Sequence, residues 1–185
     1  MLQQLTATIA PPGPRTAATG RGAVLSIEAA RRRRARRPQS RDLIRVLVVG
    51  SHALTRAGLR LLLEDDADLA VVGEAPSGAE GARLVRATDP DVVLLDAGCL
   101  EPDPVASTRV LAGRVAVLLL TESEADDRVL AALRTGATGV LAKDSHPAEL
   151  ATAVRTLASG GALLPPRTGR RLITELVNTT SLVPR

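Results

Sequence analysis

The stretch Arg45–Leu63, RVLVVGSHALTRAGLRLLL, joins an apolar run to an amphipathic segment through a short polar turn. The run has the length and valine content of a strand, and the segment after the turn repeats its leucines at helical spacing. A strand followed by a helix is the unit from which parallel sheets are built. Ligands bind such sheets at the carboxyl ends of the strands, so the turn Gly50–His52 marks one wall of a candidate site.

This unit occurs five times from residue 42 onward. The predicted strands are 43–49, 69–73, 91–95, 115–120 and 138–142, and the predicted helices are 53–64, 77–88, 104–112, 123–135 and 147–159. Gly136 and the pair Gly160-Gly161 are expected to end the last two helices. The apolar runs are continuous rather than alternating, as expected for strands covered on both faces. The fold class is therefore α/β, a flavodoxin-like (βα)5 doubly wound parallel sheet of five strands.

Charge divides the chain into unlike parts. Residues 1–41 hold nine arginines and one acid, a net charge of +8, whereas the other 15 basic and 19 acidic residues give −4. Proline, glycine and the lack of apolar periodicity predict that 1–41 is a disordered Arg-rich tail. Residues 42–160 form the predicted domain. Residues 161–185 are expected to be a linker with a short helix, whose apolar side carries Leu172, Ile173, Leu176 and Val177.

The composition disfavours several kinds of chemistry. The chain has no Phe, Tyr or Trp, so a flavin or a base has no ring to stack on, although the Gly50–His52 turn would suit a phosphate. Cys99 is the only cysteine, which excludes an internal disulfide. His52 is expected at a helix start and His146 in the loop before Pro147. Neither has a partner at metal-ligand spacing, so no metal centre is predicted from them.

Targeting signals are missing from the sequence. No apolar run approaches the 18 residues of a membrane span, and no basic segment precedes a secretory apolar core. We therefore expect a cytoplasmic protein that does not contact membranes.

Three polar side chains follow apolar strands. Asp96 ends DVVLLD, Thr121 ends VLLLT, and Lys143, the only lysine of the chain, ends GVLAK. Because parallel strands end at one edge of the sheet, the three side chains are expected to converge. A carboxylate can accept a phosphoryl group, and a hydroxyl and an ammonium can hold its oxygens. Each residue alone is ordinary at a strand end, but the three together indicate a phosphoryl site.

Residues 43–178 resemble the receiver domain of bacterial two-component response regulators, in particular the NarL/FixJ branch. The resemblance is carried by IRVLVVGSHALTRAGLRLLLE, VVGEAPSGAEGARLVRATDPDVVLLD and GATGVLAKDSHPAELATAVRTLASGGALL. It implies a CheY-like fold with Asp96 as phospho-acceptor, Thr121 as switch hydroxyl and Lys143 as the lysine typical of the family. It also implies a non-enzymatic regulator of transcription that forms a homodimer and has a sensor histidine kinase as partner.

The chain departs from the family at the end of its first strand. Where the family has two acids that hold Mg²⁺ together with the acceptor, this chain has Gly50 and Ser51. Two unit charges ~4 Å apart interact by roughly 4 kcal/mol at an effective dielectric constant of ~20, so their loss matters. We expect weakened Mg²⁺ binding at Asp96 and no other cofactor. Glu101 or Asp103, in the loop after Asp96, are the nearest candidate substitutes.

A second departure concerns the switch. Val140 stands where the family usually has an aromatic ring that rotates on activation, and the loop after the acceptor reads AGCLEPDP. These features favour an atypical receiver controlled without phosphorylation, through a dimer surface or another ligand.

Contact with DNA is expected only in two ways. One is through an output domain that these residues do not contain, and the other is non-specific binding by the arginines of 31–37. The alternative hypothesis is a basic-tailed nucleic-acid-associated protein whose folded domain only oligomerises.

Overall fold

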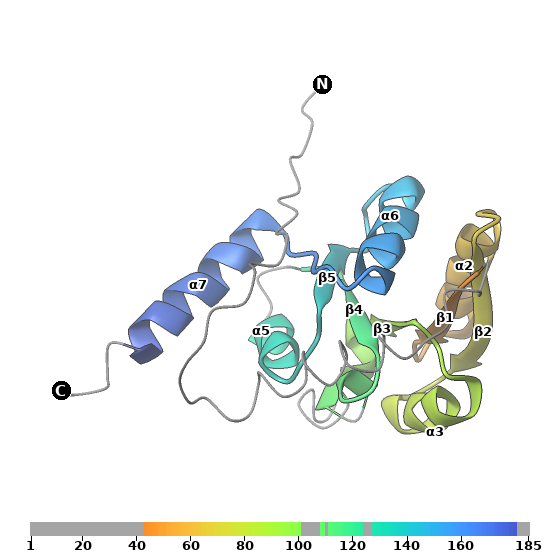
Figure 1. The fold of residues 1–185 in the computed structure, drawn as a ribbon, viewed down its shortest axis with the longest axis horizontal. Coiled ribbons are helices and arrows are strands. Elements are labelled where there is room, and N and C mark those ends of the chain that lie inside the picture. Colours follow the sequence, from red (N-terminus) through yellow and green to blue (C-terminus); the bar gives the residue numbers. More distant parts are fainter. Residues whose placement is uncertain (1–42, 101–107, 110, 124–126, 181–185) are drawn as a thin grey trace.

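The computed structural model describes residues 43–100, 108–109, 111–123 and 127–180 (Figure 1). Its strands are β1 (Ile44–Val49), β2 (Leu69–Ala75), β3 (Val92–Asp96), β4 (Ala116–Thr121) and β5 (Gly139–Ala142). They form one parallel sheet in the order β2-β1-β3-β4-β5. The predicted α/β fold class is confirmed. The strand order reverses direction at β1, which places the switch point between β1 and β3.

Helices cover both faces of this sheet. These are α2 (Ala53–Glu64), α3 (Gly78–Thr88), α5 (Asp127–Arg134) and α6 (Pro147–Ala158). The chain also forms a 3-10 turn, η1, at Ala97–Leu100 and a C-terminal helix, α7 (Pro166–Thr180). Figure 1 shows α2 and α6 on one side of the sheet and α3 and α5 on the other. Along β1, Val46 and Val48 join the core under α2 and α6, whereas Leu47 and Val49 join the core under α3 and α5. Burial on both faces explains the continuous apolar runs of β1, β3 and β4, whereas the edge strand β2 is mostly half-buried and carries Glu74.

The helix boundaries agree with the sequence in most places. Gly136 (φ 115°) and Gly160 (φ 85°) adopt positive φ after α5 and α6, the conformation that lets a glycine end a helix. The fourth helix, predicted to begin at about residue 123, is described as α5 from Asp127, and Ser123 itself is not helical, because its main chain binds the Thr121 hydroxyl. Only 108–109 and 111–112 of the third predicted helix are described, and these are helical.

The C-terminal segment forms a longer helix than expected. Helix α7 has 15 residues, and Figure 1 shows it leading away from the sheet past α5. An ion pair of 2.8 Å between Arg171 Nη2 and Asp127 Oδ1 joins it to α5. Within the described part of the chain, no helix combines the length and apolar character that a membrane span needs.

Some predictions fall on residues that the structure does not describe. These are the whole of the tail 1–41, including the arginines of 31–37, and the two loop acids Glu101 and Asp103. They remain predictions from the sequence.

Candidate phosphoryl-acceptor site

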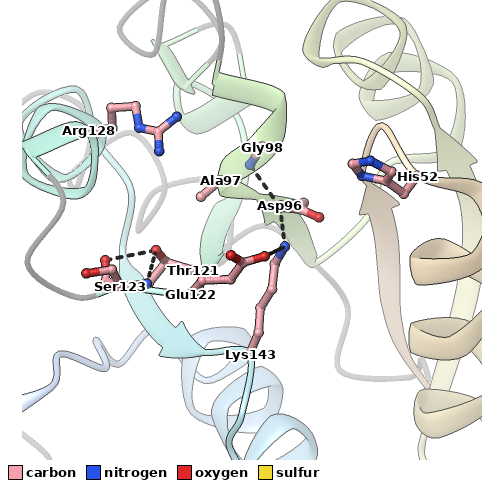
Figure 2. A pocket seen from close by; sticks show the side chains of 9 residues that line it. All are labelled: His52, Asp96, Ala97, Gly98, Thr121, Glu122, Ser123, Arg128 and Lys143. Atoms are coloured by element: carbon pink, nitrogen blue, oxygen red, sulfur yellow. Dashed lines mark hydrogen bonds and ion pairs between the residues drawn. The ribbon is translucent and has the colours of Figure 1, made fainter.

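The three strand-end residues lie in one pocket. Asp96 is the last residue of β3, Thr121 is the last of β4, and Lys143 directly follows β5. The pocket is lined by His52, Asp96, Ala97, Gly98, Thr121, Glu122, Ser123, Arg128 and Lys143 (Figure 2). The parallel register brings these residues together, since neighbouring strands end at the same level.

Asp96 is buried, and its two carboxylate oxygens differ. Oδ1 accepts a hydrogen bond of 2.9 Å from the Gly98 N–H and lies 2.9 Å from Lys143 Nζ. Oδ2 is also buried, but it has no hydrogen-bond partner among the described residues. An unpaired buried oxygen of this kind costs about 1–3 kcal/mol. The side chain is therefore anchored through Oδ1 and left unsatisfied at Oδ2.

Lys143 lies between two carboxylates. Its Nζ is 2.9 Å from Asp96 Oδ1 and 3.5 Å from Glu122 Oε1, and the Glu122 side chain is 85% exposed. Burial lowers the pKa of Lys143. The hydrogen bond and charge of Asp96, together with Glu122, outweigh that effect and raise the pKa above its ordinary value. Lys143 therefore remains a cation, and Asp96 is its inner partner.

The Thr121 hydroxyl is bound to the main chain. It donates to the Ser123 carbonyl oxygen at 3.0 Å and accepts from the Ser123 N–H at 3.2 Å. Both bonds close the turn after β4, a usual role for a threonine hydroxyl. In this conformation the hydroxyl does not contact Asp96. Val140, at the position where the resemblance implies an aromatic ring, is fully buried in the core.

The end of β1 supplies no carboxylate to the pocket. A Cβ atom placed on Gly50 would lie 3.5 Å from Asp96 Cβ and 3.8 Å from Asp96 Oδ2. A side chain at position 50 would therefore face the unsatisfied oxygen, but glycine leaves that space empty. Ser51 Oγ instead pairs with His52 Nδ1 at 3.1 Å.

The described residues do not fit a magnesium site of the expected kind. Magnesium requires several oxygen ligands in near-octahedral geometry, and among the described residues the carboxylates that line the pocket are Asp96 and Glu122. No group of three or more His, Cys, Asp or Glu among the described residues is arranged to hold a metal ion. At the end of β1, Gly50 and Ser51 place no acid beside Asp96 Oδ2.

The charged side chain at the end of β1 is a cation, Arg56. Arg56 Nη1 donates to the Gly50 carbonyl oxygen at 2.6 Å and to that of Ser51 at 3.3 Å. Its Nε lies 3.5 Å from Glu74 Oε2. The side chain is 16% exposed, so water screens its charge less than at a free surface.

Two charged residues that line the pocket, Glu122 and Arg128, were not predicted from the sequence, and neither was the position of Arg56 at the end of β1. Glu122 directly follows Thr121, so its position next to a strand end was a signal. Arg128 lies in the first turn of α5 and points toward the pocket in Figure 2. Arg56 lies in the first turn of α2, and only the fold shows that it turns back to the carbonyls of β1.

The two histidines stand at helix starts, and the cysteine is buried. His52 is the N-cap residue of α2, as predicted. His146, placed in the loop before Pro147 by the sequence, is the N-cap residue of α6, and its Nδ1 accepts from the Ala148 N–H at 3.2 Å. Cys99 is buried. Its pKa is raised, mainly by burial and then by the Asp96 charge.

The size of the pocket also narrows the choice of ligand. Its volume is about 240 Å³, which is smaller than the roughly 300–1,000 Å³ of pockets that enclose drug-sized ligands. It fits a phosphoryl-sized group better than a flavin.

The fold and the site together define a class of protein. The sequence of residues 46–155, more than half of the chain, matches the family model described as the response regulator receiver domain. The chain therefore belongs to the response regulator receiver family, whose place is in two-component signalling.

Individual relatives agree with this assignment. The chain is 33% identical over 137 residues to the transcriptional regulatory protein LiaR of Bacillus subtilis, covering 72% of this chain and 65% of LiaR. It is 35% identical over 124 residues to the nitrate/nitrite response regulator NarL of Escherichia coli K12, covering 64% and 56%. The chain thus matches less than two thirds of the length of either relative.

Solved structures show the same likeness. A LuxR-family two-component response regulator from Aurantimonas sp. superimposes with a TM-score of 0.63 at 32% identity, covering 73% of this chain and 99% of that one. ChrA, the response regulator of a haem-sensing two-component system, gives 0.59 at 34% identity, covering 78% and 69%.

Proposed function

We propose that this chain is a non-enzymatic receiver whose regulatory output does not depend on Mg²⁺-assisted phosphorylation of Asp96. One observation carries the proposal: the end of β1 offers Gly50 and Ser51, so Asp96 Oδ2 faces an empty Cβ position where the resemblance implies acids. The receiver fold is retained, but the oxygen ligands that would hold a catalytic cation are not.

Electrostatics supports this reading. A phosphoryl group that approaches a carboxylate must have its negative charge balanced, usually by a metal ion. Lys143 Nζ forms an ion pair with Asp96 Oδ1, and it also forms an ion pair with Glu122. The Thr121 hydroxyl is bound to the Ser123 main chain. Lys143 and the Thr121 hydroxyl, two groups that could hold an incoming phosphoryl group, are therefore already bound to other partners.

The partners follow from the family. We propose that a sensor histidine kinase or a second copy of the chain contacts this cytoplasmic module, and that its output is regulation of transcription. The relatives LiaR and NarL are named as a transcriptional regulatory protein and a nitrate/nitrite response regulator. Because the chain spans only part of each, DNA contact would need a region beyond the receiver.

Intact mass spectrometry tests the proposal. The full chain is incubated with acetyl phosphate and excess Mg²⁺, beside an Asp96→Asn control. In a competent receiver, the Asp96 carboxylate takes the phosphoryl group and acetate leaves. We expect no gain of phosphoryl mass in either protein. A gain in the native chain that Asp96→Asn abolishes would show that phosphorylation still operates and would overturn the proposal.

A further inference from the structure

We propose that the chain covers helix α2 with a segment of its own, residues 23–37, which precede the described part of the chain. The apolar residues of this segment lie on exposed leucines of α2, and its arginines lie beside the acids that follow α2. The surface it covers is separate from the acceptor pocket, so the inference does not depend on the proposed function.

The first observation is an exposed apolar face on α2, which we call the outer face. Leu54 is 90% exposed and Leu61, seven residues later on the same side of the helix, is 71% exposed. Between them lies Gly58, where an added Cβ atom would meet nothing within 4 Å. Leu62, at the margin of this face, is 44% exposed. The opposite side of α2 already packs in the core through Leu63, whereas a surface helix usually has one apolar side.

The second observation is a surplus of negative charge where α2 ends. Four acids stand there, namely Glu64, Asp65, Asp66 and Asp68. Arg60 forms an ion pair with the first of them, and Arg155 forms ion pairs with the last two. In the described part of the chain, the acids thus outnumber the arginines that pair with them. This end of α2 therefore attracts further cations.

The third observation is the place where residues 1–42 join the domain. Leu43, the first described residue, is 43% exposed, and the N–H of Ile44 donates to the Asp68 carbonyl oxygen at 2.8 Å. The chain therefore enters the sheet beside the acids that follow α2. Arg37, the last residue of the arginine run, precedes this point by only six residues, which is roughly 20 Å of extended chain.

The order of the segment matches the order of the surface. Residues 23–30 read AVLSIEAA and residues 31–37 read RRRRARR. Going back from the start of β1, the arginines therefore come first, beside the acids, and the apolar residues come next, over the outer face. Leu54 and Leu61 are about 10 Å apart along the helix axis, a distance that eight residues can span in either a helical or an extended form.

Charge favours this occupant over a second copy of the chain docking through its own α2. A second copy would bring the same surplus of acids to the contact, whereas residues 1–41 hold nine arginines and one acid. The covalent link also favours the segment, because a tethered partner binds at a high effective concentration. The segment thus forms a cover that any partner of the outer face has to displace.

Methyl NMR on the full chain tests the apolar contact with variants that change only the segment. The test compares Val24→Ser with Leu25→Ser against a control pair, Leu2→Ser with Leu5→Ser, which removes two apolar side chains from the chain outside the segment. The first pair is expected to shift the methyl resonances of the outer-face leucines, and the control pair is expected to leave them in place. Neither pair should move the exposed Ile173 on α7, which lies at the opposite end of the molecule from α2 (Figure 1).

A second set of variants tests the arginines. Arg33→Gln with Arg34→Gln is expected to shift the backbone amide resonance of Asp65. The control, Arg15→Gln with Arg21→Gln, removes the same charge outside the segment and is expected to leave that resonance in place.

The outcomes separate the segment from other occupants. Outer-face leucines that do not move in Val24→Ser with Leu25→Ser overturn the proposal, and so does an equal shift in the control pair. An unmoved Asp65 amide overturns it as well, because the arginines then lie elsewhere. A contact within one chain does not change on dilution, so shifts that follow protein concentration would assign the outer face to a second copy and overturn the proposal.

Discussion

The two halves of the acceptor site differ in what their strands carry at the ends. The half built by β3, β4 and β5 carries Asp96, Thr121 and Lys143, with an ion pair of 2.9 Å at its centre. The half built by β1 carries Gly50 and Ser51, and the cation beside them comes from helix α2. The first half carries the residues that the resemblance to receivers implies, and the second carries Gly50 and Ser51 in place of the implied acids.

This difference teaches that the fold and the chemistry depend on different parts of the same strand. The body of β1, Val46–Val49, is fully buried in the two cores. The turn that follows β1, Gly50–His52, lies outside the strand, and Ser51 and His52 are exposed. Acids can be lost from such a turn without loss of core burial, which is the main source of stability. A receiver can therefore keep its fold while its site changes.

The largest effect is expected when the β1 half is rebuilt. The double variant Gly50→Asp with Ser51→Asp should bind Mg²⁺ about a hundredfold more tightly than the native chain, because two negative charges return beside Asp96 Oδ2. The side chain at 50 has room, since its Cβ meets neighbours only at 3.4 Å or more. Isothermal titration calorimetry measures the change.

The control for this variant adds Asp96→Asn to it. The gain in affinity should then disappear, since the site loses its third carboxylate. An undiminished gain would mean that the new acids bind metal away from the acceptor, and the comparison between the two halves would no longer hold.

The fold was predictable because buried strands and helices place their apolar residues at regular positions in the sequence. Strands covered on both faces read as continuous apolar runs, and the strand and helix positions followed from these runs and from Gly136 and Gly160. Ser123 departs from the predicted helix for a local reason, since the Thr121 hydroxyl bonds to both main-chain groups of Ser123. A single side-chain bond of this kind has no periodic signal.

The residues of the site were predictable only where they stand at the ends of strands. Asp96, Thr121 and Lys143 end apolar runs, and parallel strands bring such ends together. Arg56 belongs to an amphipathic helix, and nothing in its spacing shows that its guanidinium turns back to the Gly50 and Ser51 carbonyls. Long side chains reach across elements, so their contacts depend on packing that a sequence does not display.

A smaller effect is expected in the intact half. Lys143→Met should lower the free energy of unfolding by about 1–3 kcal/mol, because the buried Asp96 carboxylate loses its partner. Chemical denaturation measured by far-ultraviolet circular dichroism gives the value. Asp96→Asn with Lys143→Met should recover part of the loss, since the unpaired charge is removed as well.

The same pair also has a pH dependence. The pKa of Lys143 is raised in the folded state above its ordinary value of 10.5. Its contribution is therefore complete below pH 10.5 and is lost as the pH rises through the folded-state pKa. The difference in stability between the native chain and Lys143→Met should shrink over this range. Both proteins keep Cys99, whose raised pKa then affects them alike, and no tyrosine titrates beside it.

The smallest effect is expected at Glu122, the exposed carboxylate beside Lys143. Glu122 lies 3.5 Å from Lys143 but its side chain is 85% exposed, and exposed ion pairs contribute only about 0–1 kcal/mol. Glu122→Ala should change the free energy of unfolding by less than about 0.5 kcal/mol, and that change should fall further in high salt. A loss as large as that of Lys143→Met would mean that the lysine is held from the solvent side. The 2.9 Å bond to Asp96 would then not be the contact that keeps this half of the site together.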